Sequence, residues 1–230
     1  SLCMIVCDEE EHLERCLSSA VDTVSEMIIV DTGSQDRSVE IARSYGARVI
    51  SIPWRGDFSE ARNLSLEYAT KPWILVLDAD EEWVVPPAEQ LIEMMDEAEA
   101  FGYYVQLQSY VGATGEEFIT DSVCRFFRND ERLRFRGMIH EEIATCILEV
   151  EPEGVRFSPM VVKHYGCLDH VIAQKNKAAR NVSLIQKALL EKPDDPVLIY
   201  ALGTKYFQQE EYQKARVLFE ALLSAVPLRV

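Results

Sequence analysis

The sequence lacks an apolar run long enough to cross a bilayer, and we do not expect its amino end to act as a signal peptide. A membrane-spanning helix needs roughly 20 consecutive apolar residues, and every apolar stretch in this 230-residue chain is interrupted earlier. The amino end carries consecutive acidic residues from Asp8 to Glu11, which is not typical of a secretory leader. We therefore expect a protein that has no transmembrane segment and works in the cytoplasm.

Positive charge is also scarce. The chain has 23 Lys and Arg against 39 Asp and Glu, so its net charge is -16. Such a chain repels a nucleic-acid backbone unless a local groove concentrates its cations. The only basic cluster, at residues 125–136, is short and is interrupted by Asp130 and Glu131. We expect no nucleic-acid partner.

The six cysteines include no Cys-x-x-Cys pair. Cys3 and Cys7, on one expected strand, would lie about 13 Å apart, which is too far for a disulfide. We expect reduced cysteines with structural roles. A cytoplasmic chain does not meet the N-glycosylation machinery, so the sequons at Asn63 and Asn181 carry no information.

The most informative segment is a short apolar run, Trp73 to Leu77, that ends abruptly at Asp78, Ala79, Asp80 and Glu81. The run reads as a strand buried on both faces, with the carboxylates at its carboxyl end, where open α/β sheets place their ligands. Gathered carboxylates favour a divalent cation such as Mg²⁺ or Mn²⁺ carried with a diphosphate. In the alternative interpretation, the Asp only caps the next helix.

The first half of the chain alternates strand and helix patterns. This order predicts a parallel sheet with helices on both faces. The expected strands are Leu2 to Cys7, Met27 to Val30, Arg48 to Ile52 and Trp73 to Leu77, and the expected helices are Glu10 to Ala20, Asp36 to Tyr45 and Ser59 to Ala69.

The pattern changes after a helix that Pro86 and Pro87 open and that runs to about Ala100. From Tyr103 to Tyr165 the chain is rich in short β runs separated by turns with glycine. We expect an antiparallel extension that covers the site. Its strands should include Tyr103 to Tyr110, Val123 to Phe127 and Val155 to His164.

Three helices are expected after Leu168, at about Asp169 to Glu191, Val197 to Gln208 and Tyr212 to Ala225. The last two resemble one tetratricopeptide repeat, at about residues 196–229. The matching residues are Ile199, Leu202, Gly203, Tyr206, Ala215, Phe219 and Pro227. A plain helical hairpin is the alternative. Because one repeat cannot bury its own face and the chain starts at Ser1 without Met, we expect the natural protein to be longer.

The loops after the first three strands should converge on the acidic strand end. The second loop holds Asp31, Gly33, Ser34 and Asp36. Gly33 permits a close backbone approach, and Ser34 or Asp36 can cap the next helix and leave amide donors free. Helix capping alone is the alternative for each motif, but together the loops predict one polar cleft.

Four ordered motifs carry a family resemblance: Ser1 to Val6 with Glu9-Glu10, Ile28 to Arg37, Asp57 to Asn63 and Leu77 to Glu81. They resemble the motifs of family 2 glycosyltransferases, which have the GT-A fold, an α/β architecture with a Rossmann-like mixed sheet and flanking helices. The subgroup that pairs this domain with tetratricopeptide repeats, like the bacterial peptide S-glycosyltransferases, is the most similar. The resemblance implies a glycosyltransferase domain at 1–168 and a helical region at 169–230.

The resemblance also implies roles for individual residues. Asp31 would bond the base, Arg62 and Asn63 would lie near the base and the diphosphate, and Asp78 would contact the ribose or sugar. The implied donor-binding set is Asp31, Gly33, Ser34, Arg62, Asn63, Asp78 and Ala79. Without the family context, Arg62 reads equally well as a surface ion pair with Glu60 or Glu67. Cys7 and Asp8 depart from the usual Lys-Asn pair, so donor contacts from that loop are not implied.

The implied catalytic residues follow the β-rich segment. Asp80 would ligate Mn²⁺ or Mg²⁺, and His164 of the His164-Tyr-Gly166 turn resembles a further metal ligand, although a structural His is the alternative. His140 and Glu141 belong to the motif that supplies the base on the acceptor side. Glu141 is our choice of base, with Glu142 as its competitor because strand alternation would turn the two side chains to opposite faces.

The reaction implied is metal-dependent transfer of a sugar, with inversion, from a nucleotide-sugar donor to a peptide, protein or saccharide acceptor. Uridine diphosphate is the carrier that the resemblance most often implies. A nucleotidyltransferase usually carries a basic, glycine-rich phosphate loop after its first strand, where this chain has acids. In an aspartyl-phosphate phosphatase the Asp-x-Asp follows the opening strand, not the fourth. A repeat scaffold with a decayed site is the non-enzymatic alternative. The sequence leaves a homo-oligomer open.

Overall fold

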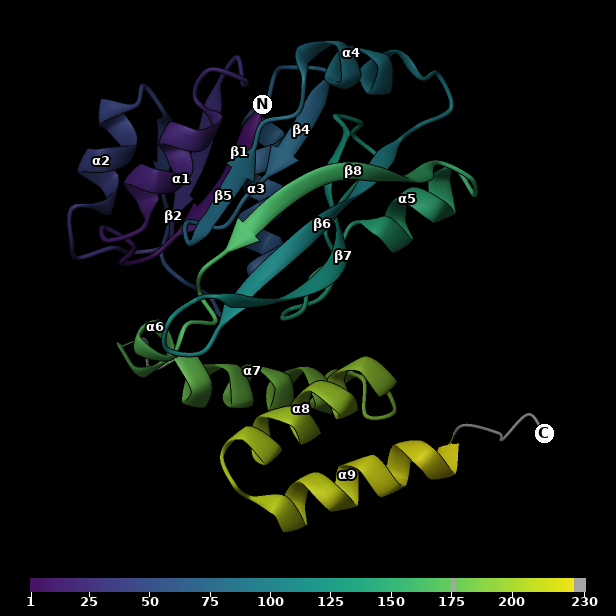
Figure 1. Ribbon diagram of the computed structural model, residues 1–230. Helices are drawn as coiled ribbons and strands as arrows, with labels where there is room; N and C mark the ends of the chain where they lie inside the picture. The colour runs from purple at the N-terminus through teal and green to yellow at the C-terminus, as the bar shows by residue number, and fades with distance from the viewer. Residues whose placement is uncertain (175–176, 226–230) are drawn as a thin grey trace.

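A single mixed sheet of eight strands organises the molecule. The computed structural model describes residues 1–174 and 177–225 (Figure 1). The strand order is β3-β2-β1-β4-β7-β6-β8-β5. The strands are β1 (Leu2–Val6), β2 (Met27–Asp31), β3 (Arg48–Ser51), β4 (Trp73–Val76), β5 (Glu81–Val84), β6 (Gly102–Val111), β7 (Glu117–Arg128) and β8 (Val155–His164).

The first four strands form the expected parallel half of the sheet. β1 lies between β2 and β4, and β3 extends the sheet beyond β2. All residues of β2 and β4 are buried, as expected for strands covered on both faces. Because these strands are parallel, the loops that follow them meet at one edge, and this edge carries Asp31 and Asp78 to Asp80.

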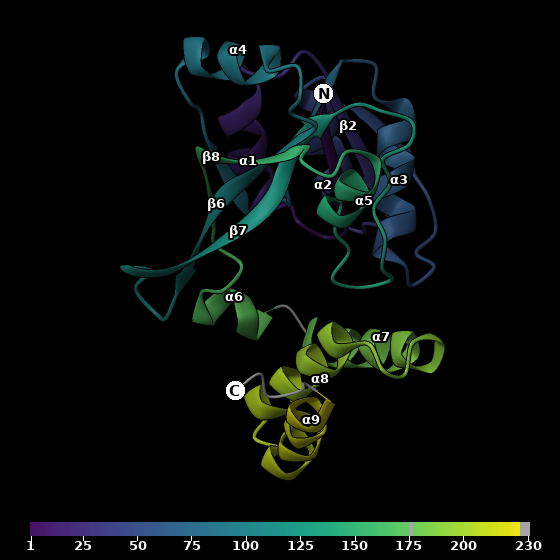
Figure 2. The same cartoon turned by 90° about the vertical axis from the view of Figure 1, so that its right-hand side faces the viewer.

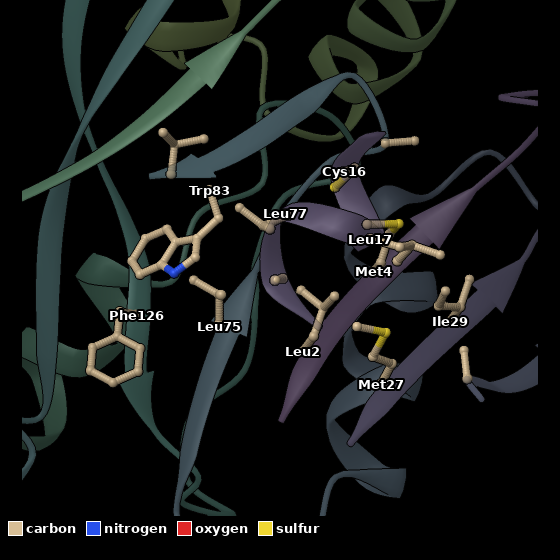
Figure 3. Packing of buried hydrophobic residues seen from close by; sticks show 14 of the residues in the cluster. Leu2, Met4, Cys16, Leu17, Met27, Ile29, Leu75, Leu77, Trp83 and Phe126 are labelled. Carbon is tan, nitrogen blue, oxygen red and sulfur yellow. The ribbon is translucent and has the colours of Figure 1, made fainter. Parts of the chain in front are cut away.

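Helices cover both faces of the sheet. On one face the core joins α1 (Leu13–Ala20), α2 (Ser38–Ser44) and α4 (Ala88–Asp96) to the sheet. Figure 3 shows part of this core, where Leu2, Met4, Leu75, Leu77 and Trp83 pack together. On the other face, α3 (Phe58–Tyr68) and α5 (Ala144–Val150) pack in a second cluster around Phe127 and Ile147.

The second half of the sheet differs from expectation in three ways. β5 and α5 were not predicted. β6 pairs antiparallel with β7 but parallel with β8, so the expected antiparallel extension is wrong in that pairing. The reason is that the chain crosses over through α5 between β7 and β8, and returns in the direction of β6. β7 also begins earlier than predicted, at Glu117.

A helical tail follows the sheet: α6 (Asp169–Gln174), α7 (Lys177–Glu191), α8 (Pro196–Gln208) and α9 (Tyr212–Ala225). α8 and α9 form a hairpin in which Gly203 lies against Phe219, since a Cβ there would be 2.6 Å from the ring. Pro227 lies outside the described residues, so the repeat stays a prediction. Ile139 of the sheet domain shares an apolar cluster with α7 and α8.

Among the helices of the described residues, none combines the length and the apolar character required to cross a membrane.

Gly102 is the first residue of β6 and packs against Ile147 of α5. A substitution at Gly102 therefore tests the packing of α5 on the sheet. A Cβ there would lie 2.7 Å from Ile147 Cδ1 and 3.1 Å from Cys124 Sγ. We predict that Gly102→Ala lowers the free energy of unfolding by about 1–3 kcal/mol, measured by denaturant unfolding. Ile147→Val removes the Cδ1 methyl, so the double variant should lose less stability than the two single losses added together. Strict additivity would contradict this contact.

Candidate active site

A cavity of about 670 Å³ lies at the carboxyl edge of the parallel strands. Its walls come from parts of the chain that are distant in sequence. They include the end of β1 (Val6 and Cys7), the turn Asp78 to Asp80, the strand segment Ser122 to Arg125, residues 139–144, and Arg180 with Asn181 of α7. The expected convergence of loops on the acidic strand end is therefore observed: Cys7 follows β1, Thr32 follows β2, and Trp54 and Phe58 follow β3.

Asp78 is held by two arginines from opposite sides. Arg62 Nη2 of α3 donates to Asp78 Oδ1 at 2.7 Å, and Arg125 Nη2 of β7 donates to Asp78 Oδ2 at 2.9 Å. Although burial opposes the charged form, the two guanidinium groups hold the pKa of Asp78 well below its usual range. Asp78 is therefore a fixed anion in the cavity wall.

Glu81 is a buried member of the same network, because it is bonded to Arg125. Its side chain is 1% exposed, and Oε1 accepts from Arg125 Nη2 at 2.9 Å. Oε2 accepts from the backbone N–H of Asp78 at 2.8 Å and so fixes the turn. Burial raises the pKa of Glu81 to about 7, against the lowering effect of Arg125. Glu81 does not line the cavity, so its role is to position Arg125 and the turn.

Arg62 links the donor side of the cavity to the expected base. Its Nε donates to Glu141 Oε1 at 2.5 Å, in addition to its bond with Asp78. The side chain is 7% exposed, and Nη1 is buried with no hydrogen-bond partner. The surface ion pair with Glu60 or Glu67 is therefore not formed. A buried guanidinium nitrogen with an unused N–H, at the wall of a cavity, is suited to an anionic or carbonyl acceptor on a ligand.

Asp80 and His164 face each other across the same turn. Asp80 Oδ1 lies 3.7 Å from His164 Nε2, because β5 pairs with β8 and places Glu81 opposite His164. Ser109 Oγ lies 3.1 Å from His164 Nδ1, which leaves Nε2 directed toward Asp80. Although burial opposes it, the contacts with Cys167 and Asp80 raise the pKa of His164.

Gly166 lies against the pair formed by Asp80 and His164. A Cβ at this position would lie 2.5 Å from Asp80 Oδ2 and 2.6 Å from His164 Nε2. Any other residue here would press its Cβ against both the carboxylate and the imidazole. The turn is anchored to the acidic motif, since the N–H of Tyr165 donates to the carbonyl of Asp80 at 3.0 Å.

Four expected donor-binding residues do not line the cavity: Asp31, Gly33, Ser34 and Asn63. Asp31 is buried, and its Oδ1 accepts from the N–H of Ser34 at 3.0 Å. Asn63 instead clamps the backbone of Phe135, donating to its carbonyl at 3.0 Å and accepting from its N–H at 2.8 Å. In this state Asn63 supports the loop that leads to Glu141.

Both candidate bases line the cavity, because residues 136–142 form a loop and not the strand that would turn them apart. Glu141 is bonded to Arg62, whereas Glu142 is exposed and its Oε2 accepts from the N–H of Thr145 at 3.1 Å, near the start of α5. His140 also lines the cavity and has a φ of 56°. A left-handed conformation in a residue other than glycine is costly and is common at functional sites.

Sequence reasoning missed several residues of this cavity. Arg125 gave no signal, because one charged residue in a β run reads as solvent-facing. Arg180 of the tail was also missed; its Cζ lies 5.4 Å from the centroid of the Phe58 ring. Phe58 and Trp54 belong to the loop after β3 that was expected to reach the site, and their tilted rings have centroids 4.8 Å apart. The contribution of α7 depends on tertiary packing and has no local sequence signature.

Comparison of the sequence with protein families and with individual proteins identifies the family of this chain. The model of the family "Glycosyl transferase family 2" matches residues 1–148. A TPR repeat-containing protein of Synechococcus elongatus is 34% identical over 221 residues, which cover 94% of this chain and 54% of that protein. The prophage-derived glycosyltransferase SunS of Bacillus subtilis is 26% identical over 217 residues, covering 92% and 50%. The chain thus spans about half the length of these relatives.

Solved structures share the fold at low sequence identity. Staphylococcus aureus TarS 1-349, in complex with UDP-GlcNAc, has a TM-score of 0.58 and 14% identity, and the match covers 98% of this chain and 81% of TarS. Mannosyltransferase PcManGT from Pyrobaculum calidifontis, in complex with GDP-Man and Mn²⁺, has a TM-score of 0.56 and 16% identity, covering 99% and 75%. The mixed sheet with its flanking helices is a GT-A fold, and the chain belongs to glycosyl transferase family 2.

Proposed function

We propose that this protein transfers a sugar, with inversion and with the help of a divalent metal, from a nucleotide-sugar donor to an acceptor. The observation that carries the proposal is the arrangement of Asp80, His164 and Gly166 beside the fixed anion Asp78. Two solved structures with this fold contain a nucleotide sugar, and one of them also contains Mn²⁺. These complexes support the same donor class here.

The chemistry of the cavity fits a metal carried by a diphosphate. Among the described residues there is no group of three or more acidic, His or Cys side chains that could hold a metal ion. Asp80 and His164 would therefore supply two ligands, and the diphosphate and water would supply the others, as is usual for Mg²⁺ and Mn²⁺. When bound, the ion would neutralise negative charge on the leaving diphosphate.

The protein's own groups would perform three tasks. Asp78 is locked by two arginines and offers a fixed acceptor for donor hydroxyl groups. Arg62 would hold Asp78 and Glu141 in place beside the donor. Glu141 would remove the acceptor proton as the bond from the anomeric carbon to the diphosphate breaks and the bond to the acceptor forms.

The bond between Arg62 and Glu141 couples these tasks. While Arg62 binds Glu141, one carboxylate oxygen is occupied, and the other can still face the acceptor. The bonds of Arg62 to Glu141 and Asp78 thus fix the position of the candidate base relative to the acidic turn.

A panel of nucleoside diphosphates and their sugars, with and without Mn²⁺, tests the donor class by thermal shift. At a ligand concentration of 100 times Kd, linkage adds about 2.7 kcal/mol to the free energy of unfolding. For a chain of this size that is a rise of about 5–10 °C in Tm. We expect one nucleotide to stabilise the protein most, and only with the metal. No stabilisation by any nucleotide would contradict the proposal.

The variant Gly166→Ala tests the metal site without removing a ligand. Its methyl group would lie against both Asp80 and His164, so we predict that it abolishes most of the Mn²⁺-dependent rise in Tm. The same clash lowers the metal-free Tm, so the response is measured as the difference between the Tm with and without Mn²⁺ for each variant. Tyr165→Phe is the matched control in the same turn, because it removes only the bond to Glu82. Equal metal responses in Gly166→Ala and wild type would place the metal elsewhere.

Two matched substitutions test the base. We predict that Glu141→Gln lowers kcat by about 10²- to 10⁴-fold with little change in the KM for the donor, measured with saturating acceptor. Glu142→Gln should keep turnover within a few-fold, because this side chain bonds the start of α5. The reverse result would assign the base to Glu142. Donor hydrolysis without acceptor should remain in both variants, which would exclude a decayed site.

A further inference from the structure

The edge of β7 beside the cavity has no neighbouring strand along most of its length. β4 pairs with β7 only at Phe126 to Arg128, because β4 ends at Val76 and the chain turns away into Asp78 to Asp80. β7 continues outward to Glu117 and pairs there with β6 alone. In the described part of the chain, no strand or isolated bridge occupies the other side of residues 117–124. We call this free edge of β7, along residues 117–124, the open lane.

Both faces of this part of β7 are also uncovered. The first six residues of β7 are all exposed, although neighbouring residues of a strand point to opposite faces. They include Phe118 at 47% and Ile119 at 65% exposure. Figure 2 shows the β6–β7 hairpin extending well beyond the body of the sheet. A long exposed edge with apolar residues is a template for pairing with another strand.

The open lane leads into the candidate active site. Four consecutive residues of β7, from Ser122 to Arg125, line the cavity. Because consecutive side chains alternate between the faces of a sheet, the cavity meets the edge of the strand and not only one face. Glu142 is close enough to act electrostatically on Cys124, raising the pKa of that thiol in addition to the effect of burial. The inner end of the lane therefore lies beside the loop that carries the candidate bases.

We propose that the acceptor is an extended peptide segment that adds a strand to β7 along the open lane, with its modified side chain at the cavity end. This inference rests on the proposed function and names its acceptor class. Main-chain hydrogen bonds to the free edge would supply affinity. The lane from residue 117 to 124 is about 23 Å long, which accommodates a segment of seven or eight residues.

The charges along the open lane indicate which charged side chains the peptide carries. Glu116, Glu117 and Asp121 lie on or beside the exposed part of β7, and no ion pair with a cation is formed by them within the described residues. Arg125, the nearest cation of the strand, is already bonded to Asp78 and Glu81. The lane is thus complementary to an extended peptide with lysine or arginine on the side chains near Glu117 and Asp121.

The test uses nine-residue peptides in which lysine alternates with valine and threonine and a serine stands at one end, because the modified side chain is placed at the cavity end of the lane. One peptide carries the serine at its amino end and the other at its carboxyl end. With ¹⁵N-labelled full chain, we expect binding of one of these peptides to shift the amide signals of residues 117–125. A peptide of the same sequence with alternate backbone amides N-methylated keeps its side chains but cannot pair. Its affinity should fall by about tenfold or more.

A charge swap provides the matched variants. Glu117→Lys with Asp121→Lys should weaken binding of the basic peptide by about tenfold and strengthen binding of its glutamate counterpart. Glu89→Lys with Glu93→Lys makes the same change on exposed positions of α4 and should alter neither affinity. Retained Tm in both double variants excludes unfolding as the cause.

Several results would overturn the proposal: amide shifts confined to α8 and α9, tolerance of N-methylation, no response to the charge swap, or an oligosaccharide that protects the edge amides when the peptide does not. The thermal shift with nucleotide and Mn²⁺ on the same preparation distinguishes failure of this acceptor proposal from failure of the proposed transferase function. Stabilisation by nucleotide together with any of these results removes the open-lane acceptor and keeps the transferase. Absence of nucleotide stabilisation removes the transferase itself.

Discussion

The site depends on placing carboxylates together in the interior of an already acidic chain. Asp78, Glu81 and Glu141 are linked through two shared arginines, and burial makes the charged form of a carboxylate costly unless a cation is bonded to it. Arg62 and Arg125 meet this requirement, since each bonds two of these carboxylates. Arginine suits the role because it stays charged and its planar donors can bridge two carboxylates. The two arginines come from α3 and β7, so the network also joins the parallel half of the sheet to the β-rich half.

Sequence patterns identified the elements whose stability is local or periodic. The strands around Ile29 and Leu75 are continuous apolar runs, and the structure places them in the buried parallel half as predicted. The strand Val155–His164 was predicted with its observed limits. β5 was missed because Glu81 and Glu82 read as a turn, and only pairing with β8, about 80 residues later, makes them a strand. α5 is seven residues long with no side-chain cap, so packing on the sheet and not local propensity defines it.

The site shows the same division between local and tertiary information. The motif spacing placed Asp78 and Asp80 at a strand end, and the structure brings His164 and Arg62 to them. Which carboxylate each arginine binds could not be read from the sequence, because Arg62 and Glu141 are 79 residues apart. Asn63 illustrates the converse: its position in a motif implies contact with a ligand, yet its amide is used by the backbone of Phe135.

The loop that carries His140 and Glu141 is held in position by contacts on both of its sides. Asn63 fixes it at Phe135, and the N–H of Phe58 donates to the carbonyl of Met138 at 3.0 Å. On the far side, Ile139 is buried among Leu184 and Ile185 of α7, so the apolar core of the tail continues into the loop. The left-handed backbone of His140 is held between these anchors, because relaxing it would disturb the packing of Ile139 or the bond of Arg62 to Glu141. The helical tail is therefore part of the structure that orients the candidate base, in addition to any role in binding a partner.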